Sequence, residues 1–224
     1  MLRPEPGLAS TLAAVRACGL QAAACPLFAI EPVAWDVPPD ASFDALLIGS
    51  ANAVRHGGMA LRRLAHLPVI AVGEASARVA REAGLTVSRA GTGGLQAMLD
   101  TLARESQPMR LLRLAGEAHV PLALPAGMAM TEAIVYRAAP LPIDAATADR
   151  LRGGGVALLH SGEAARRFAS ECDRLGIPRA RLALAILAPR IAALAGSGWG
   201  EVGIAEGMSD GELLELAKEM CQKP

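Results

Sequence analysis

The sequence predicts an α/β protein of two lobes, each with a parallel sheet that is flanked by helices. Short apolar runs alternate with longer helical stretches along the chain, a pattern typical of parallel sheets covered on both faces. Most apolar runs end in a small polar or glycine turn, and the order of these turns occurs twice. The core must consist mainly of Ala, Leu, Val and Ile, because 52% of the 224 residues are hydrophobic but only 3% are aromatic.

The first half of the chain has the elements of one such sheet. Short apolar runs predict strands, and Gly84 is a natural C-terminal stop for the helix before it. In order, we expect a helix at about 5–18, strands at 20–24 and 45–48, a helix from 51 to about 66, a strand at 69–72, a helix from 74 to about 83, a strand at 85–87, a helix that follows Gly91-Thr92-Gly93-Gly94 and ends near 104, and strands at 109–114 and 129–136.

The second half repeats this order with fewer strands. Gly176-Ile177-Pro178 breaks its first helix, and Ser209-Asp210 is expected to cap its last. We expect a strand at 156–159, a helix from about 162 to 175, a strand at 182–187, a helix from 189 to 195, a strand at 201–205 and a helix from about 210 to 220.

The strand count predicts how the two lobes divide the chain. The stretch 38–135 supplies five strands, whereas the stretch after 140 supplies three, and an open α/β sheet usually has four or five. The N-terminal piece supplies the difference. We therefore expect a discontinuous lobe 1 (1–30 plus 140–224) with lobe 2 (38–135) inserted into it. Two proline-rich passages, Glu31–Pro39 and Arg137–Pro142, would be the paired connections, with 31–37 and 136–139 as the two-stranded linker or hinge.

Composition excludes several classes of function. The formal net charge is zero, which gives no electrostatic case for binding nucleic acid or an anionic membrane. The four cysteines form no C-x-x-C pair, so we expect reduced thiols and no metal site. The glycine-rich stretches lack dinucleotide and P-loop spacing, which disfavours a nucleotide-dependent enzyme. With no signal peptide and no membrane-spanning apolar run, the chain is expected to be soluble and cytoplasmic.

The turns after the strands are the candidate ligand site. In an open parallel sheet, ligands bind beyond the carboxyl ends of the strands, where helix N-termini present free N–H groups. Each small polar turn alone is also explained as a helix cap, so the case for a ligand rests on their recurrence in both halves. Among four scattered histidines, His160 lies nearest such a turn. The sole tyrosine, Tyr136, is either a packing residue or the best-placed proton donor.

Short motifs along the whole chain resemble those of the uroporphyrinogen-III synthase family. They are Arg3-Pro4, Pro26-Leu27-Phe28, Ser50-Ala51-Asn52-Ala53-Val54, Ala71-Val72-Gly73-Glu74-Ala75-Ser76-Ala77, Arg113-Leu114-Ala115-Gly116-Glu117, Val135-Tyr136-Arg137 and His160-Ser161-Gly162. The resemblance implies two flavodoxin-like lobes. It also implies a cyclising hydro-lyase that closes hydroxymethylbilane, with inversion of ring D through a spiro intermediate, in heme biosynthesis. Such an enzyme needs no cofactor or metal, and the family is usually monomeric.

The resemblance also implies roles for particular residues. Tyr136 would assist departure of the substrate hydroxyl, and Ser50, Ser76 and Ser161 would bind substrate carboxylates. The full set of expected substrate-binding residues is Arg3, Ser50, Ala51, Asn52, Gly73, Ser76, Gly116, Glu117, His160, Ser161, Gly162 and Arg190.

Two departures from the family pattern stand out. A late turn usually written Gly-x-x-Thr-Ala reads Ala188-Pro189-Arg190-Ile191-Ala192 here, and Arg190 would replace the lost hydroxyl as a carboxylate partner. Only Met1-Leu2 precede Arg3, where relatives have several apolar residues, so we expect the natural chain to start further upstream. The alternative to a synthase is a non-catalytic bilobed protein, either a small-ligand sensor or a degenerate homologue.

Overall fold

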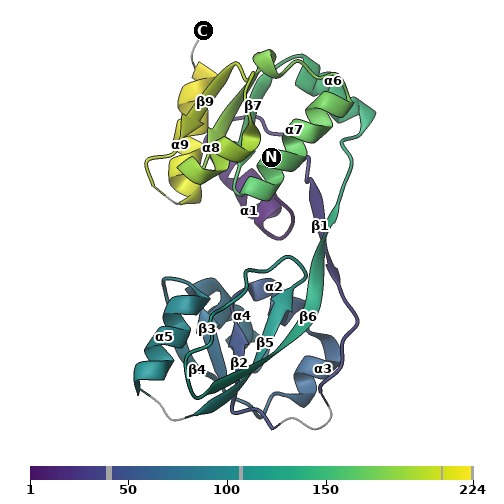
Figure 1. Ribbon diagram of the computed structural model, residues 1–224. Helices are drawn as coiled ribbons and strands as arrows, with labels where there is room; N and C mark the ends of the chain where they lie inside the picture. Colours follow the sequence, from purple (N-terminus) through teal and green to yellow (C-terminus); the bar gives the residue numbers. More distant parts are fainter. Residues whose placement is uncertain (39–41, 106–107, 208, 223–224) are drawn as a thin grey trace. The chain divides into compact units, whose positions relative to one another are not determined.

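The computed structural model describes residues 1–38, 42–105, 108–207 and 209–222, and its chain forms two compact units (Figure 1). Unit 1 consists of Met1–Ala29 and Pro140–Pro224, and unit 2 of Ile30–Ala139. The chain passes between the units in two strands, β1 and β6, within which both unit boundaries fall. Every helix within the described residues is too short or too polar to span a lipid bilayer.

Unit 2 is built on a six-stranded sheet of order β1-β6-β5-β2-β3-β4. Strands β2 to β6 pair in parallel. Counted along the chain, these five have the order 3-2-1-4-5, whereas flavodoxin itself has 2-1-3-4-5. The elements are β1 (Phe28–Pro32), β2 (Ala45–Ile48), α2 (Ala51–Arg55), α3 (Gly58–Arg63), β3 (Val69–Val72), α4 (Glu74–Glu82), β4 (Val87–Gly91), α5 (Leu95–Glu105), β5 (Met109–Gly116) and β6 (Met128–Pro140).

Helices cover both faces of this sheet. Strand β2 is buried at every position, and its side chains alternate between two hydrophobic clusters. Leu46 and Ile48 pack with α2, α3 and α4, while Ala45 and Leu47 pack with α5. The prediction of parallel sheets flanked by helices is confirmed. The expected stop at Gly84 is also observed, since this residue has φ +80° and Leu85 N donates to Ala80 O at 3.0 Å, the bond that closes a Schellman motif.

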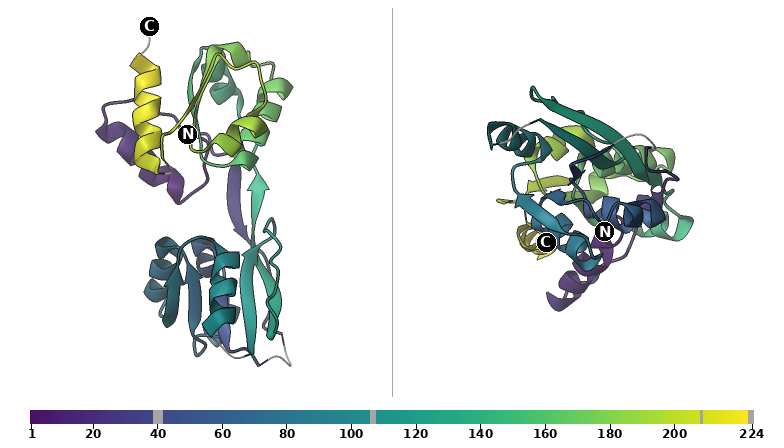
Figure 2. Two further views of the ribbon diagram at one scale, coloured as in Figure 1. Left: turned by 60° about the vertical axis from the view of Figure 1, so that its left-hand side comes forward. Right: turned by 90° about the horizontal axis from the view of Figure 1, so that it is seen from below.

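Unit 1 contains a three-stranded parallel sheet of order β7-β8-β9. Figure 2 shows α1 and α9 side by side, and the two share one hydrophobic cluster with Leu158 and Ala185 of the sheet. Helices α6, α7 and α8 pack on the other face. The elements are α1 (Gly7–Ala17), α6 (Ala145–Arg152), β7 (Gly155–Leu159), α7 (Gly162–Arg174), the 3-10 turn η1 (Arg179–Arg181), β8 (Leu182–Ile186), α8 (Pro189–Ala195), β9 (Glu201–Ile204) and α9 (Asp210–Gln222).

The prediction of a strand at 20–24 is wrong. Within the described residues this stretch is irregular, although Met1 N donates to Ala23 O at 2.9 Å and Cys25 N to Met1 O at 2.9 Å. These bonds, together with that from Leu27 N to Leu2 O at 3.1 Å, hold the segment beside the N-terminal residues without forming a strand ladder. The N-terminal piece contributes Leu2 and Leu27 to the core of unit 1, but it adds no assigned strand to the sheet.

Other elements differ in their bounds. The single helix expected from 51 to 66 is two short helices, because Gly58 has φ +61° and the Gly57 carbonyl accepts a bond from Trp35 Nε1 at 3.0 Å. The strand expected at 85–87 begins later, as β4, and β6 extends beyond 129–136 at both ends. Helix α6 was not expected. Asp144 caps it by accepting from Thr147 N at 2.7 Å.

Candidate functional site

A cavity of about 440 Å³ lies in unit 2 at the carboxyl ends of β2 and β5. These two strands are neighbours where the strand order reverses, which is where open α/β sheets bind ligands. The volume falls within the range of small-molecule sites, about 300–1,000 Å³. Three of the expected site residues line it: Ser50, Gly116 and Tyr136. Ser50 also caps α2 by accepting from Asn52 N at 3.2 Å.

Tyr136 stands against the end of β5, where it is the register partner of Gly116. A Cβ at position 116 would lie 2.6 Å from Tyr136 Cζ and 2.9 Å from its hydroxyl oxygen. Only glycine therefore allows the tyrosine ring to occupy this place. On another side, the ring faces His56 at 6.3 Å between centroids. Burial, and then the charge of Arg55, lowers the pKa of His56, so this imidazole is neutral near pH 7.

An ion network that the sequence reading missed adjoins the same cavity. Arg113 on β5 has a side chain only 4% exposed, and its Nη1 donates to Glu132 Oε1 at 2.6 Å. His119 Nε2 lies 3.1 Å from the other oxygen of Glu132, and its Nδ1 lies 2.7 Å from Gly116 O. Burial opposes the ionisation of Glu132, but the hydrogen bonds from His119 and Arg113 outweigh it and lower the pKa of this carboxyl.

The network fixes the loop that forms one wall of the cavity. Arg113 Nη2 donates to Val120 O at 3.0 Å. Further along the loop, Gln96 Nε2 donates to Ala123 O and Ala123 N donates to Gln96 Oε1, both at 2.9 Å. Because Val120 and Leu122 of this loop line the cavity, these bonds hold the wall in place. A charged residue inside the apolar run Leu111–Leu114 was the available sequence signal.

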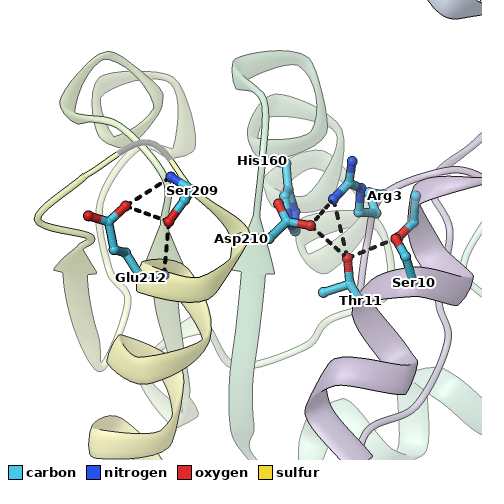
Figure 3. Close-up of polar contacts among 8 residues, drawn as sticks. Arg3, Ser10, Thr11, His160, Ser209, Asp210 and Glu212 are labelled. Carbon is cyan, nitrogen blue, oxygen red and sulfur yellow. Dashed lines mark hydrogen bonds and ion pairs between the residues drawn. The ribbon is translucent and has the colours of Figure 1, made fainter. Parts of the chain in front are cut away.

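A second polar cluster lies in unit 1 at the carboxyl end of β7 (Figure 3). Arg3 Nη1 donates to Asp210 Oδ2 at 2.6 Å and to Thr11 Oγ1 at 3.2 Å. Thr11 Oγ1 is also 3.2 Å from Asp210 Oδ2. His160 directs its Nε2 toward Asp210 Oδ1 at 3.4 Å. The structure thus brings together two expected site residues, Arg3 and His160, and adds Thr11 and Asp210, which were not expected.

His160 is uncharged at neutral pH. Its side chain is 11% exposed, and neither ring nitrogen makes a hydrogen bond to any described residue. Burial, followed by the nearby charge of Arg3, lowers its pKa to about 4, although Asp210 opposes this. Ser161 follows directly and caps α7 by accepting from Ala164 N at 3.2 Å. The cluster therefore presents a cation held by one carboxylate, next to a neutral imidazole.

The remaining expected residues do not line the unit 2 cavity. Asn52 accepts from Arg55 Nη1 within α2, and Ser76 is buried in α4. Gly162 allows α7 to approach α8, since a Cβ there would collide with Leu194. Gly73 precedes α4 with φ +85°, and Ala51 begins α2. Glu117 is exposed and donates its backbone N–H to Tyr136 O, while Arg190 is exposed at the start of α8.

The described residues contain no group of three or more His, Cys, Asp or Glu side chains that could hold a metal ion. Both candidate regions instead combine small turns, hydroxyls and balanced ion pairs. This donor set suits binding of carboxylates and proton transfer to oxygen.

Comparison with known proteins gives one family. Residues 9–215 match the model of the family described as uroporphyrinogen-III synthase HemD. The chain is similar in fold to uroporphyrinogen-III synthetase from Helicobacter pylori (TM-score 0.59, 15% identity, covering 85% of this chain and 90% of that one). It is also similar to a mutant uroporphyrinogen III synthase from Thermus thermophilus (TM-score 0.54, 17% identity, both chains fully covered). No curated protein matches the chain at a significant level.

Proposed function

Because the chain belongs to the uroporphyrinogen-III synthase family, we propose that it closes hydroxymethylbilane to uroporphyrinogen III with inversion of ring D. The proposed reaction is the net loss of one water molecule, which makes the enzyme a cyclising hydro-lyase. The terminal hydroxyl of ring A leaves with a proton to give an azafulvene. The substituted carbon of ring D attacks this electrophile, and the resulting spiro intermediate fragments and recloses.

The enzyme has two tasks in this reaction. The linear substrate also closes spontaneously to the symmetric type I isomer, so the protein must hold a flexible chain in one geometry. Holding reacting groups in place is an orientational contribution that can reach several kcal/mol. The second task is to protonate the departing hydroxyl, because water leaves far more readily than hydroxide.

Tyr136 is the proposed proton donor, and its position carries the proposal. Its ring lies at the wall of the unit 2 cavity, at the point where the strand order reverses, and Gly116 leaves the space that the ring needs. The phenol can donate its hydroxyl proton to the leaving oxygen. The neutral His56 ring beside it adds no cation that would favour early loss of that proton.

The substrate carries eight carboxylates, and we propose that they bind at the strand-end turns of both units. Ser50 and its turn serve unit 2, while Arg3, His160 and Ser161 serve unit 1. Near the start of α8 no side-chain hydroxyl caps the helix, since Ala188 is the N-cap and Pro189 occupies the first turn. Exposed Arg190 is therefore proposed to take a carboxylate there. A discontinuous lobe joined by a hinge, a monomeric state and a cytoplasmic location belong to the same proposal.

One assay tests the proposal. Purified protein is supplied with hydroxymethylbilane, the products are oxidised, and the type I and type III isomers are separated by chromatography. The proposal expects type III product. Type I alone would favour the non-catalytic alternative, and binding of the linear substrate without turnover would identify a degenerate homologue.

A further inference from the structure

Asp210 begins α9, but the helix does not need its side chain as a cap. Ser209 and Glu212 already form a capping box, because Glu212 N donates to Ser209 Oγ at 3.3 Å and Ser209 N to Glu212 Oε2 at 3.0 Å. Figure 3 shows these two residues apart from the Asp210 carboxylate, which is directed instead at Arg3, Thr11 and His160. The Asp210 carboxylate therefore does not serve the helix itself, and its role must lie in its contacts with Arg3, Thr11 and His160.

We propose that Asp210 is a positioning residue for carboxylate binding: it fixes the Arg3 guanidinium beside His160, with donors left over for an anionic group of the substrate. This inference rests on the proposed function, in which Arg3 and His160 meet substrate carboxylates. All four residues of the cluster belong to unit 1.

The hydrogen bonds of Arg3 support this assignment. Asp210 and Thr11 both use Nη1 of the guanidinium, and no acceptor among the described residues engages Nε or Nη2. The Arg3 side chain is 28% exposed. Gly7 lets the guanidinium lie against α1 with its Nε and Nη2 side, since a Cβ at that position would collide with Nε, Cζ and Nη2. Arg3 is therefore held at Nη1 by two hydrogen bonds and packs on Gly7 with its Nε and Nη2 side, where its N–H groups keep no acceptor among the described residues. A guanidinium binds a carboxylate best through two parallel N–H groups.

Asp210 could also act in the opposite sense, by repelling an incoming carboxylate. Its side chain is 46% exposed, so solvent and salt screen that repulsion. A free arginine, in contrast, must lose its rotamer freedom when it binds. Fixing such a side chain beforehand is worth about 2- to 10-fold in affinity. We therefore expect the positioning effect to exceed the repulsion.

The test is Asp210→Asn, which keeps the shape of the side chain and removes its charge. Binding is measured by fluorescence titration with uroporphyrin III, a stable octacarboxylate, and turnover is measured with hydroxymethylbilane. We expect the Kd for the porphyrin and the KM for hydroxymethylbilane to rise about 2- to 10-fold, with kcat changed less than twofold. The control Glu215→Gln removes an exposed charge from the same helix, where Glu215 pairs with Lys218, and should change neither value.

A double variant separates positioning from mere stabilisation. If Asp210 acts through Arg3, Asp210→Asn adds no further loss of affinity in an Arg3→Met background. Glu212→Gln, which weakens the capping box without touching Arg3, should lower the melting temperature but leave the Kd unchanged. The inference is overturned if Asp210→Asn tightens porphyrin binding, if its effect is additive with Arg3→Met, or if the wild type does not bind the porphyrin. Porphyrin binding by a wild type that forms no type III isomer would refute the proposed function alone.

Discussion

The contact between Gly116 and Tyr136 gives the sharpest prediction. In Gly116→Ala, the new Cβ would lie 2.6 Å from Tyr136 Cζ. Carbon atoms in contact settle at about 3.5–4.0 Å, so the ring must move by about 1 Å. A misplacement of this size costs up to about 100-fold in rate. We expect kcat for type III formation to fall about 10- to 100-fold, with the free energy of unfolding lowered by about 1–3 kcal/mol.

The assay is initial-rate formation of the type III isomer, with thermal unfolding of each variant recorded alongside. Gly211→Ala is the matched control, because the nearest atom to its new Cβ is Ser209 Oγ at 3.8 Å, an ordinary contact. It should keep wild-type kcat. If the loss in Gly116→Ala comes from moving Tyr136, adding Tyr136→Phe should cause little further loss. Wild-type kcat in Gly116→Ala, or full additivity with Tyr136→Phe, would show that the contact with Gly116 does not set the position of the Tyr136 ring for catalysis.

Tyr136→Phe should lower kcat while leaving the melting temperature within a few degrees of wild type, and undiminished turnover in steady-state assays would remove Tyr136 from the mechanism. Glu132→Gln should cost about 1–3 kcal/mol in urea unfolding, because buried Arg113 loses the charge of its partner; an unchanged midpoint would mean that solvent compensates Arg113. Glu171 is 3% exposed, and its carboxylate accepts hydrogen bonds from Arg174 and from Ile143 N. The hydrogen bonds from Arg174 are the largest cause that lowers its pKa from 4.5 to about 2. The ionised Glu171 therefore contributes about 3 kcal/mol to the free energy of unfolding, which is fully present above about pH 4.5 and is lost as the pH falls toward 2. Glu171→Gln should accordingly flatten the acid limb of a plot of stability against pH. An acid limb that is unchanged in this variant would contradict the prediction.

Local signals in the sequence were enough to predict most of the fold. The strand β8 and the helix α8 follow from a short apolar run and an Ala-Pro turn, because both signals lie within a few residues. The prediction of a strand at 20–24 is wrong because its outcome depends on residues far away in the sequence. The apolar pattern is present, but strand formation depends on a regular ladder with a partner elsewhere in the chain, and the backbone bonds near this segment are isolated ones to Met1 and Leu2.

The candidate site was less accessible from sequence for the same physical reason. The turns at Ser50 and Gly116 are marked by local residue types, and both line the unit 2 cavity. The ion pairs are not marked locally, since Arg113 meets Glu132 through the register of two parallel strands. Arg3 and Asp210 are separated by 207 positions and meet only because α1 and α9 pack on the same face of their sheet.

The dependence of the product isomer ratio on protein concentration shows whether the protein forms uroporphyrinogen III. Hydroxymethylbilane is allowed to react at a fixed time and pH with increasing amounts of the wild-type protein, and the oxidised isomers are quantified. We expect the type III fraction to rise with protein concentration and to approach all of the product, at the expense of type I. A type I fraction that stays at its spontaneous level at every protein concentration would contradict it.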